Sequence, residues 1–198
     1  MPEYYYDIEV GFEDDALIER MRRGEKGGFN PRICKIITIQ YQRLDSSGRA
    51  VSDLTILKEW ESSEEDIIRK FSRMLNPQDP WAFIPVGHNI HFDLGTFKER
   101  AAKYGMEYDN WFIYHNLPTI DVKPICIALN DFKFSGCGLD KFTGKGQSGL
   151  MVPVWYHDKE YDKVVDYVKK EAAEFVKFYQ NLKQKMPLMR RHFDLSKK

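Results

Sequence analysis

A buried strand that leads directly into a helix constrains the fold of this chain more than any other segment. Residues 81–90 (WAFIPVGHNI) are mostly apolar, as a strand covered on both faces would be, and residues 93–105 (DLGTFKERAAKYG) predict a helix that ends at a glycine. Such a junction is typical of parallel sheets, because a crossover must carry the chain back before the next parallel strand begins. A ligand site at this junction would fit, since ligands of such sheets bind at the carboxyl ends of the strands.

The N-terminal part of the chain predicts three antiparallel strands. The three segments are rich in aromatic and β-branched residues: 4–10 (YYYDIEV), 33–44 (ICKIITIQYQRL) and 51–60 (VSDLTILKEW). Helices are predicted, by capping residues or apolar periodicity, at residues 62–75, 121–130 and 160–185. The predicted fold class is therefore α/β, with a mixed sheet of three antiparallel N-terminal strands plus parallel strands, flanked by helices.

Length and charge limit the classes of protein to which the chain can belong. Its 198 residues fit one domain, which we place at residues 1–185, followed by a basic tail at residues 186–198. Thirty Lys and Arg residues balance thirty Asp and Glu residues, so any contact with nucleic acid must be local. The three cysteines lack metal-binding spacing, and no apolar stretch approaches the roughly 20 residues of a membrane span. We therefore expect a cytoplasmic protein that makes no membrane contact.

Acidic side chains stand at two positions where the predicted elements meet. Asp7 and Glu9 lie two residues apart on the first strand and therefore share one face of the sheet. Asp93 lies four residues after Asn89, in the first turn of the helix that follows the buried strand. Each has an ordinary explanation, because an edge strand tolerates solvated acids and a helix N-terminus favours a negative charge. Only their convergence on one place would indicate a site.

The last predicted helix carries a third acidic position. At about 100° per residue, one apolar stripe forms along this helix; it consists of Val164, Val168, Ala172, Phe175, Tyr179 and Leu182. Glu171 falls within the stripe, with Tyr167 one turn before it, whereas Asp162 and Asp166 face the opposite side. A carboxylate that faces the core requires a cation, a hydrogen-bond donor or a metal, and the stripe contains no Lys or Arg. A bound ion is one explanation for Glu171.

Together these acids predict a site for hard divalent cations. The ligand set is rich in carboxylate oxygen and lacks Cys and His, which suits Mg²⁺ or Mn²⁺ better than Zn²⁺. Sites of this kind commonly serve phosphoryl transfer, in which two ions hold the attacking and leaving oxygens.

The order of these motifs resembles that of the DEDD 3′–5′ exonucleases of the ribonuclease H-like fold, and most closely the proofreading domain of family B DNA polymerases. In that family a DxE on the first strand, an N-x3-[FD] motif and a Y-x3-D on the last helix supply four acids and a tyrosine. The matching residues here are Asp7 and Glu9, then Asn89 to Asp93 with Phe92, then Tyr167 to Glu171. The resemblance spans about residues 4–182.

Two features of the third motif leave alternatives open. Glu171 stands where the family usually has Asp, so the ion position can be shifted. His157 and Asp162 also match the H-x4-D pattern of the histidine branch of the superfamily. The helical phase favours Tyr167 and Glu171, because Asp162 lies off the apolar stripe.

The resemblance implies a metal-dependent 3′–5′ exonuclease that acts on single-stranded nucleic acid with a free 3′ end, DNA being favoured. The implied ligands of two Mg²⁺ or Mn²⁺ ions are Asp7, Glu9, Asp93 and Glu171. Tyr167 would orient the attacking water, and Asn89 and Phe92 would position the terminal nucleotide.

The residues themselves also predict a path for the strand. Lysines and phenylalanines alternate with glycines between residues 132 and 145, which supplies cations and stacking surfaces. The lysines predicted to contact substrate are Lys133, Lys141 and Lys145. The same segment can equally be a solvated loop.

Three other functions stay open. They are a catalytically weak or inactive nucleic-acid-binding subunit of a repair or replication assembly, an endonuclease of the same broad fold, and a structural subunit that binds a protein partner. A homo-oligomer is equally compatible with the sequence.

Overall fold

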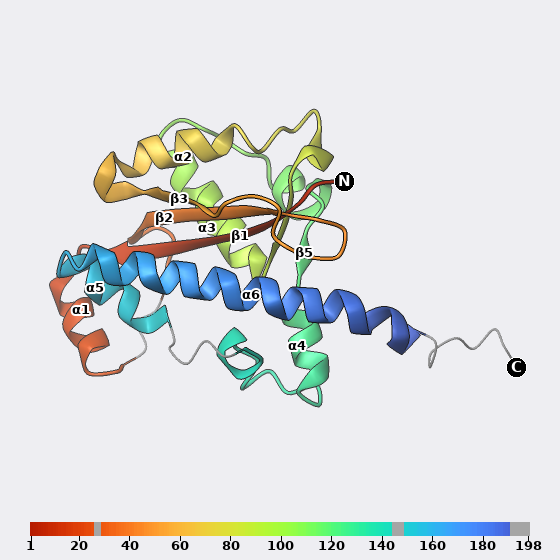
Figure 1. Cartoon of the computed structure of the whole chain (residues 1–198). Coiled ribbons are helices and arrows are strands. Elements are labelled where there is room, and N and C mark those ends of the chain that lie inside the picture. Colours follow the sequence, from red (N-terminus) through yellow and green to blue (C-terminus); the bar gives the residue numbers. More distant parts are fainter. Residues whose placement is uncertain (26–28, 144–148, 191–198) are drawn as a thin grey trace, which may run out of the picture.

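Five strands form one mixed sheet in the part of the chain that the computed structural model describes, residues 1–25, 29–143 and 149–190 (Figure 1). Their order across the sheet is β3-β2-β1-β4-β5. The strands are β1 (Glu3–Phe12), β2 (Cys34–Leu44), β3 (Thr55–Lys58), β4 (Ile84–Gly87) and β5 (Ile120–Asp121). β1, β2 and β3 pair antiparallel, whereas β4 is parallel to β1 and β5 is parallel to β4. The predicted mixed sheet of antiparallel and parallel strands is confirmed.

Two strands are shorter than predicted and one was not predicted. The third strand occupies only Thr55–Lys58, because a 3-10 turn follows at Glu59–Glu61. β4 begins after another 3-10 turn at Pro80–Ala82 and ends before Asn89, whose φ of 66° leaves the extended region. β5 is two residues long, which is too short to produce the alternation by which a strand is recognised in a sequence.

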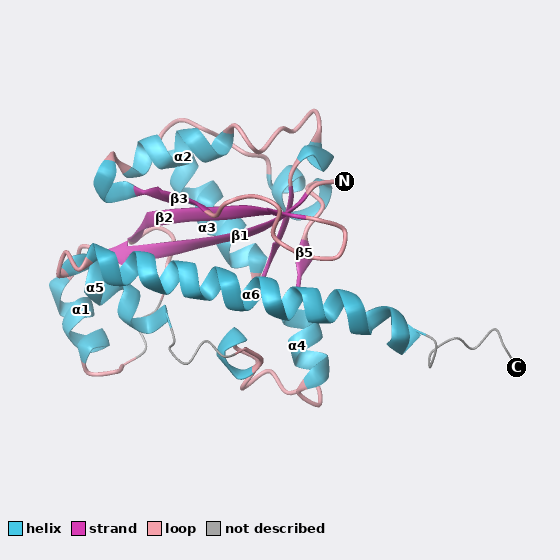
Figure 2. Ribbon diagram, viewed as in Figure 1, coloured by secondary structure: helices cyan, strands magenta, loops and turns pink. Residues whose placement is uncertain are grey.

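Helices cover both faces of the sheet (Figure 2). On one side lie α2 (Glu64–Ser72) and α3 (Ile90–Lys103), which pack on the side chains of Tyr6, Ile8 and Val10. On the other side lies α6 (Tyr161–Arg190), whose Phe175 packs on Tyr5. Because strand side chains alternate between faces, Asp7 and Glu9 lie on the α6 side of β1 with Tyr5.

Three shorter helices complete the fold. They are α1 (Asp15–Arg22), α4 (Lys123–Leu129) and α5 (Val152–His157). The predicted helices at residues 62–75 and 121–130 correspond to α2 and α4, with shorter bounds. α6 continues five residues beyond its predicted end at residue 185, through Pro187 to Arg190, so the first part of the predicted tail is helical. In Figure 1 this end of α6 extends past the sheet.

The apolar stripe predicted on the last helix is buried. Its six residues, Val164, Val168, Ala172, Phe175, Tyr179 and Leu182, all belong to the core. Within the described residues, no helix has both the length and the apolar character that a membrane crossing requires.

An irregularity in the sheet lies beside the acids of β1. Glu9 is opposite Thr38 and Val10 is opposite Ile36, so Ile37 is an extra residue on β2. Such bulges increase the local twist of a sheet and redirect side chains next to functional sites. β4 also leaves β1 early, since its last register partner on β1 is Tyr5. The edge of β1 beyond Tyr5 is therefore open to side chains from α3.

Candidate active site

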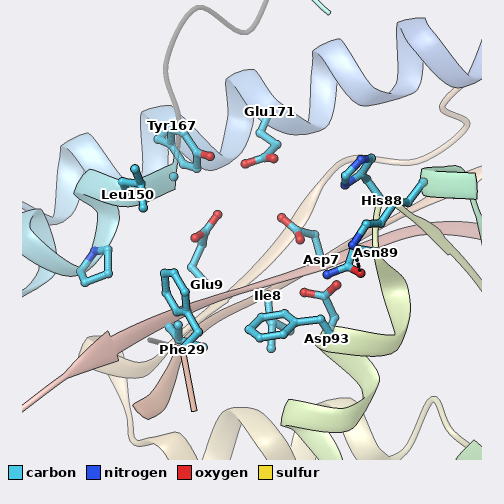
Figure 3. Close-up of a pocket in the computed structure, with 15 residues that line it drawn as sticks. Asp7, Ile8, Glu9, Phe29, His88, Asn89, Asp93, Leu150, Tyr167 and Glu171 are labelled. Atoms are coloured by element: carbon cyan, nitrogen blue, oxygen red, sulfur yellow. Dashed lines mark hydrogen bonds between the residues drawn. The ribbon is translucent and has the colours of Figure 1, made fainter. Parts of the chain in front are cut away.

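The predicted acids line one cavity of about 390 Å³ between β1, the start of α3 and α6 (Figure 3). β1 contributes Asp7 and Glu9, α3 contributes Asp93, and α6 contributes Tyr167 and Glu171. In Figure 3 the side chain of Glu171 points from α6 toward Asp7, and Tyr167 points toward Glu9. Residues that are more than 150 positions apart in the sequence thus meet at one site.

Three of these acids form a compact set of oxygen ligands. One carboxylate oxygen from each of Asp7, Glu9 and Glu171 lies within 4.8 Å of the others, and all three residues are half-buried. Oxygens at this spacing can close on a hard divalent cation with small side-chain movements. The donor set therefore fits Mg²⁺ or Mn²⁺, the ions predicted from the sequence.

Asp93 lies in the same cavity but outside that set. It is 5% exposed. Its burial, and then the negative charge of Asp7, raise its pKa well above the ordinary value, whereas hydrogen bonds from the backbone amides of Ile8 and of Asp93 itself lower the pKa. The hydrogen bond from the Ile8 amide places the Asp93 carboxylate at the edge of β1 that β4 leaves unpaired beyond Tyr5. A positive charge in the cavity would favour its ionised form.

Tyr167 is a buried hydroxyl beside the acids. Burial raises its pKa far above the ordinary value, and the charges of Glu9 and Glu171 and a hydrogen bond with Glu171 act in the same direction. The phenol is therefore a hydrogen-bond donor throughout the physiological pH range. A β-carbon on Gly149 would lie 2.9 Å from the Tyr167 hydroxyl oxygen and 3.9 Å from Oε2 of Glu9, so only glycine allows this close approach. Sequence reasoning missed Gly149.

A chain of neutral donors holds Asp7 from the neighbouring strand. Gln40 donates from Nε2 to Oδ2 of Asp7 at 2.8 Å, and the Thr38 hydroxyl donates to Oε1 of Gln40 at 2.9 Å. The Tyr5 hydroxyl also donates to Asp7, at 3.3 Å. Thr38 and Gln40 are fully buried. Sequence reasoning missed both, although two polar residues at alternate positions of an apolar strand were a usable signal.

The wall of the cavity next to Asp93 is built on Asp121. Oδ1 of Asp121 accepts hydrogen bonds from the backbone amides of Asn89 at 2.8 Å and of Lys123 at 2.9 Å. The side chain of Lys123 donates from Nζ to Oδ1 of Asn89 at 2.9 Å. Asn89, a predicted site residue, lines the cavity and has a left-handed backbone conformation. Lys123 also lines the cavity, and it was not predicted as a site residue.

Aromatic residues also line the cavity. Phe92, which was predicted to position the terminal nucleotide, lies in the lining and makes an edge contact with Phe29, at 6.2 Å between ring centroids. His88 also lines the cavity, and its Nε2 lies 2.7 Å from the carbonyl oxygen of Cys137. This bond links the cavity to the loop that follows α4.

Two of the three predicted lysines lie elsewhere. Lys133 and Lys141 are exposed and do not line the cavity. Lys133 stands between Phe132 and Phe134, which are 77% and 81% exposed. Lys145 lies outside the described residues.

The histidine alternative for the third motif is not assembled at the cavity. Asp162 is exposed on α6 and lies away from the cavity lining. His157 instead contacts Asp15 and Asp158, at 3.0 and 3.3 Å. The helical phase that favoured Glu171 over Asp162 agrees with the observed orientation of α6.

No family model matches the chain, and no curated protein matches it. Solved structures do share its fold. One is the family B DNA polymerase from the hyperthermophilic archaeon Pyrobaculum calidifontis, with a TM-score of 0.52 and 14% identity over 96% of this chain and 24% of that chain. Another is a product-bound exonuclease I, with a TM-score of 0.50 and 13% identity over 96% of this chain and 48% of that chain.

The chain therefore spans about a quarter of that polymerase and about half of that exonuclease. At these identities the likeness concerns the fold alone. It confirms the predicted resemblance at that level: the chain has the ribonuclease H-like α/β fold that an exonuclease I and a family B DNA polymerase share with it.

Proposed function

We propose that this chain is a divalent-metal-dependent 3′–5′ exonuclease that hydrolyses phosphodiester bonds at the 3′ end of single-stranded nucleic acid, with DNA favoured. The observation that carries the proposal is the set of Asp7, Glu9 and Glu171 oxygens within 4.8 Å of one another, in a cavity shared with Asp93 and Tyr167. The fold is compatible with this activity.

The residues that would hold two Mg²⁺ or Mn²⁺ ions are Asp7, Glu9, Asp93 and Glu171. When bound, such ions lower the pKa of water and stabilise charge on the leaving oxygen. Water would attack the phosphorus of the last phosphodiester and lose a proton to solvent. The bond from phosphorus to the 3′ oxygen of the preceding nucleotide would break, and that oxygen would take up a proton from solvent. A nucleoside 5′-monophosphate leaves.

The residues of the chain orient these participants. The Tyr167 hydroxyl, whose pKa is raised, keeps its proton and donates it in the hydrogen bond to Glu171. Its oxygen can accept a hydrogen bond from the water and so position it. Gln40 holds Asp7 at 2.8 Å in one orientation. Asn89 and Phe92 would position the terminal nucleotide from the start of α3, by hydrogen bond and by packing respectively.

The remaining strand would leave the cavity past His88 toward the loop after α4. The contact between His88 and the Cys137 carbonyl joins the two places, and the exposed rings of Phe132 and Phe134 flank Lys133 there. Aromatic rings beside a cation are the usual platform for single-strand bases. Lys141 and Lys145 stay proposed contacts of the strand further along the chain.

A catalytically weak or inactive nucleic-acid-binding subunit of a repair or replication assembly is the second candidate. The observation that favours it is Glu171, which has one methylene more than the Asp of the resembled family and is hydrogen-bonded with Tyr167. Such a subunit would bind single strands and leave them intact.

The test is digestion of 5′-labelled and 3′-labelled single-stranded oligonucleotides by the purified protein with Mg²⁺, Mn²⁺ or EDTA. We expect stepwise shortening from the 3′ end, lost in EDTA and in Asp7→Ala. Asp162→Ala is the matched control, because this acid lies on α6 away from the cavity and should leave the ladder unchanged. Equal activity of Asp7→Ala, or cutting of circular single strands, would disprove the exonuclease.

A further inference from the structure

Lys123 places an ammonium group in a cavity that is otherwise lined by carboxylates. Among the described residues that line this cavity, Lys123 is the only lysine or arginine. Its Nζ donates to the amide oxygen of Asn89 at 2.9 Å. Within the described part of the chain, Lys123 makes no ion pair: no carboxylate oxygen lies within 4.0 Å of its Nζ. The cation is thus held close to four acids by a neutral group.

The backbone around Lys123 is constrained at both of its contacts. Asp121 accepts from the amides of both Asn89 and Lys123, so one carboxylate joins the start of α4 to the turn before α3. Asn89 adopts φ 66° and ψ 39°, a left-handed conformation that non-glycine residues adopt at a cost of about 1 kcal/mol. Lysine side chains are usually solvated and free to rotate. Here the structure instead holds Nζ at a defined place on the cavity wall.

The charges of the cavity indicate what this ammonium is for. Among the described residues that line the cavity, four carboxylates and two divalent ions would cancel formally, as −4 and +4, and Lys123 would add one positive charge. One phosphodiester group carries one negative charge. The hydrogen bond to Asn89 uses one of the three ammonium donors, and two remain for an oxygen ligand. The charge and the free donors of Lys123 therefore match one phosphodiester oxygen.

We infer that Lys123, supported by Asn89 and Asp121, binds a non-bridging oxygen of the 3′-terminal phosphodiester and so positions the end of the strand. This inference rests on the proposed function, since it assumes a single-stranded substrate in this cavity. Lys123 acts through binding and orientation of the phosphate, and the two ions supply the chemistry.

The experiment measures binding without cleavage. Wild type, Lys123→Met and Lys123→Arg are titrated into a 5′-fluorescein oligothymidylate with Ca²⁺ in place of Mg²⁺, and a gel verifies that the oligonucleotide stays intact. A second oligonucleotide has an uncharged methylphosphonate at its 3′-terminal linkage, and a third has it four linkages further in. Lys70→Met on α2, whose partner is Asp66, is the control variant.

Loss of a charge-assisted hydrogen bond predicts about tenfold weaker binding of the all-phosphodiester strand by Lys123→Met. The methylphosphonate at the 3′-terminal linkage should weaken binding by wild type by a similar factor. It should leave the affinity of Lys123→Met almost unchanged. The slope of log Kd against log salt should fall by about 0.7 in Lys123→Met. Lys123→Arg should retain part of the affinity, and Lys70→Met all of it.

Other results overturn the inference. If Lys123→Met loses the same factor of affinity for the strand with a charged terminal linkage and for the strand with a neutral one, the residue has a structural role and makes no contact with the phosphate. If only the internal methylphosphonate removes the difference between wild type and Lys123→Met, the terminal assignment is wrong. If wild type binds no single strand with a free 3′ end, the proposed function fails, and the inference fails with it.

Discussion

Asp7 and Gln40 are direct register partners across β1 and β2, and the Gln40 amide donates to the Asp7 carboxylate at 2.8 Å. A backbone pairing thus places a neutral donor behind an ion ligand. Because Thr38 in turn orients Gln40, the carboxylate has one defined rotamer before any ion arrives. Groups that orient a ligand in this way typically contribute 10- to 100-fold to metal affinity.

Gln40→Leu should therefore weaken Mn²⁺ binding by about 10- to 100-fold, measured by calorimetric titration. The substitution keeps the side-chain size and leaves Asp7 without this donor. Gln42→Leu is the control, because Gln42 contacts the Ser52 carbonyl away from the cavity. Equal Mn²⁺ affinity in wild type and Gln40→Leu would show that Gln40 is not needed to orient Asp7.

Glu171→Gln should reduce cleavage by at least about 100-fold, since it removes an ion ligand rather than a supporting group. Glu171→Asp should fall between wild type and Glu171→Gln, because the shorter side chain keeps the charge but must reach further from α6. The rates are measured on a 5′-labelled single strand. If Asp162→Asn lost more cleavage activity than Glu171→Gln, the third motif would be the H-x4-D of His157 and Asp162 instead.

Asp93 predicts a pH dependence of stability in the absence of metal. Its pKa is raised in the folded protein, so the folded state binds this proton more tightly than the unfolded chain. The resulting stabilisation is present below the ordinary Asp pKa of about 3.9 and is lost as the pH rises toward the folded value. Asp93→Asn should therefore be more stable than wild type at pH 7 in EDTA, and nearly equal to it at pH 3.5.

The measurement for Asp93 is urea unfolding across this pH range, repeated with Mn²⁺. The added ion should remove the advantage of Asp93→Asn, because only the wild-type carboxylate gains from it. Asp162→Asn, on the exposed face of α6, is the matched control. A wild type that is more stable than Asp93→Asn at pH 7 in EDTA would contradict the assigned direction.

Gly149→Ala should lower the cleavage rate through Tyr167, since the new methyl group would lie 2.9 Å from the hydroxyl oxygen. The methyl group would push the Tyr167 hydroxyl aside. Such a displacement of a positioned group typically reduces a rate by about tenfold to a hundredfold. Tyr167→Phe removes the crowded oxygen, so adding Gly149→Ala to Tyr167→Phe should have little further effect. Fully additive rate losses would show that the two residues act independently.

Phe132→Ala and Phe134→Ala should each weaken single-strand binding by about 1 to 3 kcal/mol without lowering Tm, if these rings stack on bases. Both side chains are exposed, so their removal leaves the core intact. Trp111→Ala is a control for loss of an exposed ring, because Trp111 is 66% exposed and does not line the cavity. Unchanged affinity in both Phe variants would exclude this loop from the path of the strand.

The acids could be located from the sequence because each occupies a position with a regular period. Alternation placed Asp7 and Glu9 on one face of a strand, and the 3.6-residue period placed Glu171 within a buried stripe. Both periods are local properties of a segment, and the structure agrees with both placements.

The supporting residues could not be located in the same way. Gln40 depends on the register between two strands, Lys123 on the packing of α4 against the turn at Asn89, and Gly149 on a close approach to α6. None of these relations is a property of one segment. The lysines of the glycine-containing segment show the converse, because composition suggested a path but could not tell whether it enters the cavity.

The long sequence separation of the ion ligands has a consequence during synthesis. β1 carries Asp7 and Glu9 and leaves the ribosome early, whereas Glu171 arrives only with α6. A nascent chain without α6 has two of the three clustered carboxylates and none of the helix that covers that face of β1. The proposed ion set would therefore be completed only when α6 docks, so a nascent chain would gain the proposed activity only after α6 has been synthesised.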